Sequence, residues 1–161
     1  QDLKFPVITG GGPGIMEAAS RGAYEAGGDT LGLTIKLPNP QTVNKYITKE
    51  FDPYYFFVRK VLLSFSSEAF IFFPGGFGTF DEFFEILTLI QTKKIVDVPL
   101  ICVGADYWQA LDRFIQKELL ARGFIKAEDT QLYTITDNHD EILNIINKTP
   151  ARNIHEPHSN T

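Results

Sequence analysis

The sequence predicts an α/β fold, a Rossmann-like doubly wound parallel sheet with helices on both faces. Short apolar runs alternate with longer segments of helical pattern, as in chains built from βαβ units. The run at residues 69–73 is apolar without interruption, as expected for a strand buried on both faces. Two glycine-rich loops, at residues 10–14 and 74–79, each follow such a run. Because ligands bind at the carboxyl ends of strands in open α/β sheets, both loops are candidate sites.

The first elements are bounded by clear turn residues. Residues 5–9 form the first expected strand, and the glycine loop at its end leads into a helix at residues 15–26. The glycines at 27–28 stop this helix. Residues 30–37 form the next expected strand, and the prolines within 38–41 mark a turn-rich break.

The middle of the chain repeats the pattern. A short strand is expected at residues 46–51, and an apolar, aromatic helix at 54–66 begins just after Pro53. The strand at 69–73 then runs into the second glycine loop. A helix is expected from 80 to 92, so that the whole loop would lie outside it.

The last third supplies a strand at residues 100–103, a helix at 107–122, a strand at 132–136 and a helix at 139–147. We expect residues 1–148 to form a single nucleotide-binding domain, because a chain of this length can bury one sizeable core. The polar residues 149–161 are expected to be a flexible tail.

Composition excludes several classes of function. The formal net charge is −5, which argues against a broad nucleic-acid surface. The sequence has no apolar run long enough to span a membrane. Its one cysteine, Cys102, excludes an intrachain disulfide and suits a reducing compartment, so we expect a cytoplasmic protein. Cys102 lies in an apolar run and is interpreted as a core residue. The chain begins with Gln rather than Met, and we expect the native chain to be longer.

The loop Gly10-Gly11-Gly12-Pro13-Gly14 is the first candidate site. Glycine lets the backbone approach a ligand closely, and the following helix would present free N–H groups to a phosphate or carboxylate. The spacing matches neither the dinucleotide fingerprint GxGxxG nor the P-loop GxxxxGK[ST]. A tight turn without any ligand therefore remains an open alternative.

The loop Pro74-Gly75-Gly76-Phe77-Gly78-Thr79 is more specific. Its glycines open the backbone, and Thr79 can offer a hydroxyl to a phosphate. Asp81 and Glu82 follow at the start of the expected helix. Thr79 to Glu82 also matches the capping box T-x-x-E, in which Glu82 would only satisfy the N-cap amide. From the spacing, a catalytic and a capping Glu82 are both open.

Two adjacent cations, Arg59 and Lys60, lie in the aromatic helix predicted at residues 54–66. They can extend along apolar surface into solvent, as long charged side chains commonly do. Alternatively one of them faces a cleft and meets an anion, for which Arg59 could supply a bidentate contact. The pattern leaves both alternatives open.

Taken together, the run from Gly10 to Ala19, the pair Arg59-Lys60 and the run from Pro74 to Glu82 resemble the Lonely Guy (LOG) family, often called "possible lysine decarboxylase". The resemblance covers roughly residues 7–147. It implies a Rossmann-like phosphoribohydrolase that cleaves the N-glycosidic bond of nucleoside 5′-monophosphates, such as AMP or cytokinin ribotides, into free base and ribose 5-phosphate. It also implies a homodimer or larger homo-oligomer. The family has a first strand and helix that would precede this chain, so the first βα unit is expected to be missing.

The resemblance also implies roles for individual residues. Glu82 would stabilise the oxocarbenium-like transition state and orient the attacking water, as its place at a helix N-terminus would favour the ionised form. Arg59 would hold the nucleotide and assist departure of the base, and Lys60 would add positive charge. Asp81 would contact ribose hydroxyls, and Thr88 would line the pocket. The remaining expected substrate-binding residues are those around the 5′-phosphate: Gly75, Gly76, Gly78 and Thr79, aided by Gly11, Gly12 and Gly14.

The substrate is thus expected to be a small nucleotide, with no cofactor, metal, nucleic acid or membrane partner. One alternative is a non-hydrolytic carrier of a nucleotide or pterin cofactor, which would bind phosphate but release no adenine from AMP. A pyridoxal-phosphate-dependent lysine decarboxylase is disfavoured, because no lysine has an obvious Schiff-base context. A structural module is disfavoured by the two glycine loops.

Overall fold

The computed structural model describes residues 5–35 and 42–150. The chain divides into two compact units, Gln1–Ser67 and Glu68–Thr161. Each unit contains one three-stranded sheet in which all strands are parallel. The prediction of a Rossmann-like α/β fold is confirmed, and the single domain expected for residues 1–148 stays a prediction.

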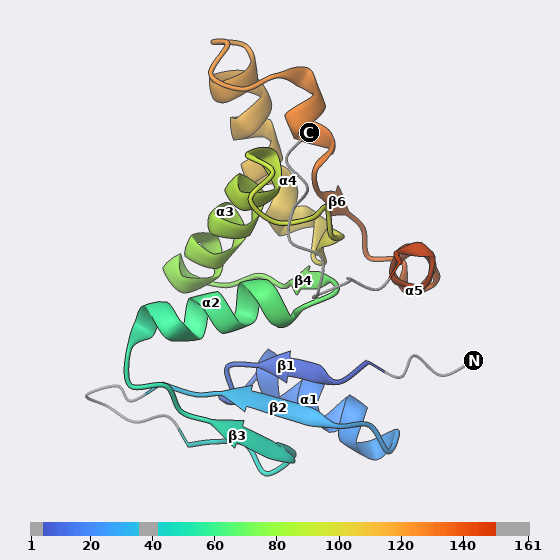
Figure 1. Cartoon of the computed structure of the whole chain (residues 1–161). Helices are drawn as coiled ribbons and strands as arrows, with labels where there is room; N and C mark the ends of the chain where they lie inside the picture. The colour runs from blue at the N-terminus through green and yellow to red at the C-terminus, as the bar shows by residue number, and fades with distance from the viewer. Residues whose placement is uncertain (1–4, 36–41, 151–161) are drawn as a thin grey trace. The chain divides into compact units, whose positions relative to one another are not determined.

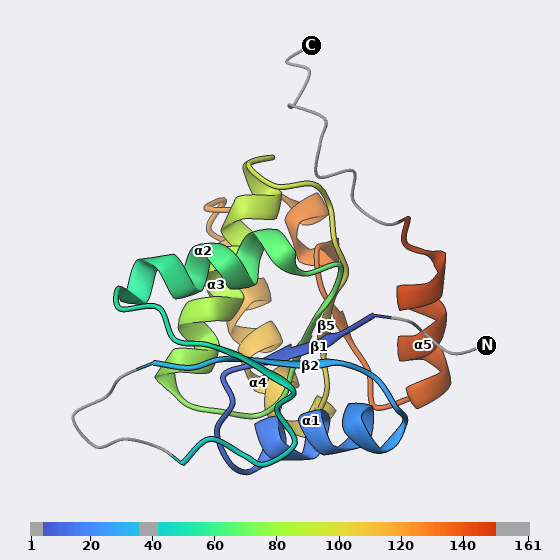
Figure 2. The same cartoon turned by 60° about the horizontal axis from the view of Figure 1, so that its bottom comes forward.

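The first unit carries the sheet β1-β2-β3. Its strands are β1 (Val7–Thr9), β2 (Thr30–Leu33) and β3 (Lys49–Phe51), and its helices are α1 (Ile15–Glu25) and α2 (Phe56–Ser66). A parallel pair needs a crossover connection, which α1 provides between the first two strands. Figures 1 and 2 show α1 lying beside β1 and β2. The crossover brings the carboxyl ends of β1 and β2 to the same edge of the sheet.

A pair of threonines joins β2 to the residues just before β3, which is shorter than the strand predicted at 46–51. The backbone N–H of Thr30 donates to Thr48 Oγ1 at 3.0 Å, and Thr48 Oγ1 donates to the Thr30 carbonyl at 2.9 Å. The Thr30 hydroxyl donates to the carbonyl of Tyr46. These side-chain hydrogen bonds accompany the backbone bond from the N–H of Thr48 to the Thr30 carbonyl, at 3.1 Å. Thr30 is fully buried, which is tolerated because its polar groups are hydrogen-bonded.

The second unit carries the sheet β4-β5-β6. Its strands are β4 (Phe70–Phe72), β5 (Leu100–Cys102) and β6 (Thr134–Ile135), and its helices are α3 (Phe77–Gln91), α4 (Ala105–Phe114) and α5 (His139–Lys148). A π-helical segment, Ile115–Leu120, continues α4, and a 3₁₀ turn, Ala127–Gln131, precedes β6. The sequence predicted one helix at 107–122 and contained no sign of either irregular turn.

Aromatic rings form the centre of the second core. Phe83 of α3 lies edge-on to Phe72 of β4, with centroids 5.5 Å apart, and 5.2 Å from the ring of Trp108. Ile86 and Ile90 continue the buried stripe of α3 at helical spacing. This stripe fixes the face of α3 that turns inward.

Cys102 is a core residue, as predicted. It is completely buried in β5, and this burial raises the pKa of its thiol to about 12. A thiol that stays protonated at neutral pH is a poor nucleophile, so Cys102 acts through packing.

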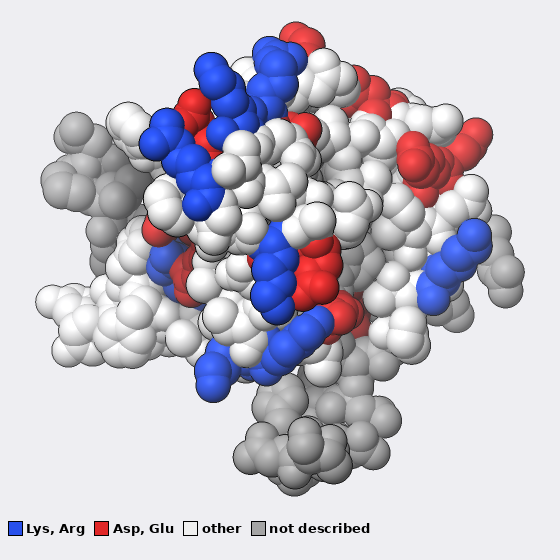
Figure 3. Space-filling model, turned by 90° about the horizontal axis from the view of Figure 1, so that it is seen from above, with Lys and Arg blue, Asp and Glu red and all other residues white. Residues whose placement is uncertain are grey.

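None of the described helices combines the length and apolar character needed to cross a membrane. On the described part of the face drawn in Figure 3, Lys and Arg side chains are interspersed with Asp and Glu. The predicted tail, residues 149–161, falls almost wholly outside the described residues.

Candidate functional site

The first glycine loop lies at the carboxyl end of β1. Gly11 has φ of +74° and Gly14 has φ of +73°, backbone conformations that strongly favour glycine. Gly14 is the N-cap residue of α1 and contributes no side chain. The N–H of Gly11 donates to Thr9 Oγ1 at 3.0 Å, so this amide already has an acceptor at the end of β1. Three glycines of this loop were predicted to bind substrate, and the hydrogen bond to Thr9 engages the amide of Gly11 rather than that of Gly12 or Gly14.

A buried asparagine, Asn44, holds this loop in place. Its Nδ2 donates to the carbonyls of Gly11 and Gly12 at 3.0 and 3.1 Å. Its backbone N–H donates to Gly11 O at 2.8 Å, and its Oδ1 accepts from the N–H of Tyr46 at 3.2 Å. The sequence analysis missed Asn44, because nothing in the pattern shows that a residue 33 positions away reaches the loop.

Arg59 of α2 lies against the same loop. Its Nε donates to the carbonyl of Leu33, at the carboxyl end of β2, over 2.8 Å. A β-carbon added to Gly10 would lie 2.8 Å from Arg59 Nη2. The side chain is half-buried and anchored by a strand end, so it does not extend freely into solvent. That it faces an anion site stays a prediction. Lys60, next along α2, is also half-buried.

The second glycine loop differs from the prediction in where its helix begins. The N-cap of α3 is Gly76, and the helix already includes Phe77, Gly78 and Thr79. The N–H groups of Thr79 and Phe80 donate to Gly76 O at 3.1 and 3.2 Å. The predicted helix start at residue 80 is therefore wrong, because helical hydrogen bonding starts three residues earlier, and Thr79 does not cap α3.

This shift removes the capping alternative for Glu82. A capping box requires Thr79 at the N-cap, whereas Thr79 is the third residue of α3 and Glu82 the sixth. The same shift weakens the expected effect of the helix dipole, which falls off beyond the first turn. Glu82 is the sixth residue of α3 and so belongs to its second turn.

Thr79 folds back over the loop. A β-carbon on Gly75 would lie 2.1 Å from Thr79 Oγ1 and 2.9 Å from its Cβ. Only glycine fits at position 75 without displacing this side chain. The hydroxyl predicted to meet a phosphate thus lies at the loop backbone.

Three carboxylates gather on α3. One oxygen from each of Asp81, Glu82 and Glu85 lies within 4.8 Å of the others. Asp81 is exposed and the two glutamates are half-buried. Thr88 is exposed and lies six residues beyond Glu82, which is about 9 Å along a helix. The structure therefore brings Asp81 and Glu82 close together and leaves Thr88 further from the loop.

The start of α4 supports the second loop, and the sequence analysis missed it. Tyr107 Oη donates to the carbonyl of Gly75 at 2.6 Å. Gly104 has φ of +98°, and a β-carbon there would lie 2.8 Å from Pro74 Cγ. The carboxylate of Asp137 accepts from the N–H groups of Gly104 at 2.6 Å and Ala105 at 3.1 Å. These two donors hold the pKa of Asp137 below its usual value.

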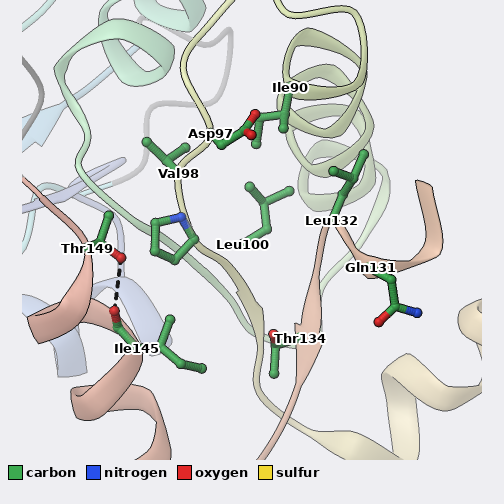
Figure 4. A pocket seen from close by; sticks show the side chains of 10 residues that line it. Ile90, Asp97, Val98, Leu100, Gln131, Leu132, Thr134, Ile145 and Thr149 are labelled. Atoms are coloured by element: carbon green, nitrogen blue, oxygen red, sulfur yellow. Dashed lines mark hydrogen bonds between the residues drawn. The ribbon is translucent and has the colours of Figure 1, made fainter. Parts of the chain in front are cut away.

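A pocket of about 320 Å³ lies elsewhere in the second unit (Figure 4). It is lined by residues at the amino ends of β5 and β6, including Pro99, Leu100 and Thr134, and by Ile90 and Ile145 from α3 and α5. The glycine loop lies at the opposite, carboxyl edge of the same sheet. Because ligands of open α/β sheets bind at carboxyl ends, this pocket is not assigned to the site.

Comparison with known protein families shows to which family the chain belongs. The family model described as "Possible lysine decarboxylase" matches residues 16–146. The chain belongs to this family, the LOG family. The matched stretch begins just after the first glycine loop and includes Arg59, Lys60, the loop 74–79 and Glu82.

A curated relative carries the LOG name. The chain is 33% identical over 144 residues to the cytokinin riboside 5′-monophosphate phosphoribohydrolase LOG5 of Arabidopsis thaliana. The match covers 85% of this chain and 60% of the relative. The chain therefore spans about 60% of the length of this LOG protein.

Solved structures share the fold of this LOG-family chain. The molybdenum cofactor binding protein of Rippkaea orientalis matches with a TM-score of 0.65 at 22% identity, covering 89% of this chain and 77% of that one. The molybdenum cofactor carrier protein of Chlamydomonas reinhardtii matches with a TM-score of 0.59 at 21% identity, covering 90% and 77%. At such identities the likeness supports the Rossmann-like fold alone.

Proposed function

We propose that the protein hydrolyses the N-glycosidic bond of nucleoside 5′-monophosphates, releasing a free base and ribose 5-phosphate. Membership of the LOG family and the printed name of LOG5 support this activity. The structural observation that carries it is in the second unit. There a glycine-rich helix start and the carboxylate of Glu82 lie within two turns of one helix, and Glu82 does not cap that helix.

The chemistry needs an anion site and a carboxylate. The 5′-phosphate would rest on the amides at the start of α3, from Gly75, Gly76 and Gly78, with the Thr79 hydroxyl. Cleavage builds positive charge on the ribose, as in other glycosidic bond hydrolyses. Glu82 would stabilise that charge and orient the attacking water, and Asp81 would contact ribose hydroxyls.

Two cations of α2 belong to the same proposal through the family resemblance. Arg59, anchored on Leu33 O, would hold the nucleotide and assist departure of the base, with Lys60 adding positive charge. Gly12 and Gly14 would aid phosphate binding. A homodimer or larger homo-oligomer follows from the family and is checked by light scattering after gel filtration.

The test is to incubate the protein with a panel of nucleoside 5′-monophosphates and to separate free bases by chromatography. We expect release of base from at least one nucleotide, and a loss of about 10²- to 10⁴-fold in turnover for Glu82→Gln, as for removal of an acid–base group. Binding of the nucleotide should persist in this variant. Glu128→Gln, in an exposed turn, is the control and should match the wild type. Equal turnover in Glu82→Gln would remove Glu82 from the mechanism.

The second candidate function is a carrier of a nucleotide or pterin cofactor. It is favoured by one observation, the shared fold with two proteins named for binding or carrying molybdenum cofactor. The same assay separates the two functions. A carrier would show a ligand-induced rise in thermal midpoint with AMP or a pterin, but no free adenine.

A further inference from the structure

The start of α4 packs closely against the second glycine loop. β4 and β5 are parallel neighbours, with Phe72 in register with Cys102, so the segments that leave their carboxyl ends lie next to each other. The N–H of Val103 donates to Phe72 O at 2.8 Å. The turn at Gly104 then packs so closely on Pro74 that a β-carbon would be 2.8 Å from Pro74 Cγ.

Tyr107 reaches from this turn to the loop. Its hydroxyl donates to Gly75 O at 2.6 Å. Its ring stacks on Phe80 at a centroid distance of 5.9 Å and 20° between planes, and meets Trp108 edge-on at 5.4 Å. Since the ring is held between two aromatic neighbours, the hydroxyl has little freedom to leave the carbonyl.

The orientation of the Gly75 carbonyl determines the orientation of the Gly76 N–H, because both belong to one peptide group. The described residues contain no cis peptide bond, and in a planar trans peptide the N–H points opposite to the C=O. With Gly75 O directed at Tyr107, the N–H of Gly76 must point to the other side of the loop. Gly76 is the N-cap residue of α3, and its amide is one of the proposed phosphate donors.

We propose that Tyr107 is a positioning residue for phosphate recognition, which acts by holding the peptide between Gly75 and Gly76 in one orientation. The inference rests on the proposed function for the identity of the ligand. A donor that is already oriented costs less to order when the phosphate binds. Tyr107 does not touch the reacting atoms, so its effect belongs to binding rather than to the chemical step.

The test compares two Tyr→Phe variants of the full chain. Tyr107→Phe removes the hydroxyl and keeps the ring stacking. Tyr133→Phe is the matched control, because Tyr133 Oη also makes a 2.6 Å hydrogen bond, to Asp112, in the same unit. We expect Tyr107→Phe to raise KM for the nucleotide, and the inhibition constants of inorganic phosphate and ribose 5-phosphate, by about three- to tenfold, the range of one neutral hydrogen bond. The kcat should stay within about twofold.

The control, Tyr133→Phe, should lower the thermal midpoint and leave KM and the two inhibition constants unchanged. The proposal is overturned if Tyr107→Phe changes only the thermal midpoint, or lowers kcat with KM unchanged. If the wild type hydrolyses no nucleotide, the proposed function fails while this inference is still decided by phosphate binding. The probe is then inorganic phosphate, titrated against the Gly76 amide resonance of ¹⁵N-labelled protein. Weaker binding in Tyr107→Phe supports the proposal, and equal binding, or no binding to the wild type, overturns it.

Discussion

A β-carbon at Gly10 would lie 2.8 Å from Arg59 Nη2, so the absence of a side chain at Gly10 leaves room for that guanidinium. The same β-carbon would lie 2.9 Å from Met16 Sδ. Both obstacles are the far ends of flexible side chains, which can move without disrupting the backbone. The conflict is therefore local, and it falls on the cation proposed to hold the nucleotide.

We predict that Gly10→Ala folds but loses turnover. The displaced Arg59 should lower kcat/KM at least about tenfold, the effect of about 1.4 kcal/mol in the transition state, while the thermal midpoint falls by only a few degrees. Gly22→Ala is the control, because a β-carbon there would meet nothing within 4 Å beyond the helix's own backbone. Gly22 lies inside α1, where alanine should stabilise by about 0.5–1 kcal/mol. Full activity in Gly10→Ala would contradict the placement of Arg59 at the site.

The contact between Gly75 and Thr79 predicts an energetic coupling. Gly75→Ala should destabilise the protein by about 1–3 kcal/mol, because the new methyl group overlaps Thr79 Oγ1. In a Thr79→Ala background the cost should be smaller by at least about 0.5 kcal/mol, since the two residues are in contact. Urea unfolding of the four proteins in this double-mutant cycle measures the difference. Strict additivity would show that the loop relaxes around the methyl group.

Asn44 should matter more to stability than a polar residue in a loop usually does. Asn44→Ala removes three side-chain hydrogen bonds, at about 1 kcal/mol each, and should cost about 3 kcal/mol. Asn44→Asp keeps the shape and the acceptor but cannot donate to Gly11 O and Gly12 O. We expect both variants to be destabilised in chemical denaturation. An Asn44→Asp protein as stable as the wild type would show that the two donated bonds contribute nothing.

Cys102 predicts a weakness at alkaline pH. Burial raises the pKa of its thiol to about 12, against about 8.5 in an unfolded chain. The unfolded state therefore releases the proton first, and stability should fall as pH rises from about 8.5 towards 12. Cys102→Ala should show a shallower fall, measured as the thermal midpoint against pH. A thiol reagent should react only after unfolding, and rapid reaction with the native protein would be the contrary result.

Apolar runs and turn residues in the sequence were sufficient to predict some of the helices and strands. The buried strand β5 and the stops around α1 follow from apolar runs and glycines, and they lie where the sequence places them. The start of α3 was wrong because Thr79-x-x-Glu82 is a valid capping signal on its own. The structure begins that helix at Phe77 instead, with Gly76 as N-cap.

The residues that support the loops could not be predicted in this way. Asn44 and Tyr107 reach their glycine partners across 33 and 32 positions of sequence. Each contact depends on which strands are neighbours and in what register, and neither quantity is contained in the periodicity of one segment. Arg59 could be singled out from sequence because two cations in an aromatic helix are unusual wherever the helix packs.

Asp137 makes the start of α4 different from the start of α3. Its carboxylate already sits on the first amides of α4, as a bound anion would. Because that anion is tethered to the chain, it competes with dissolved phosphate for the same amides at a high effective concentration. A phosphorylated ligand near these neighbouring helix starts therefore meets one that is already occupied by the protein's own carboxylate. The amides at the start of α4 are thus blocked by a single acidic residue, which follows β6.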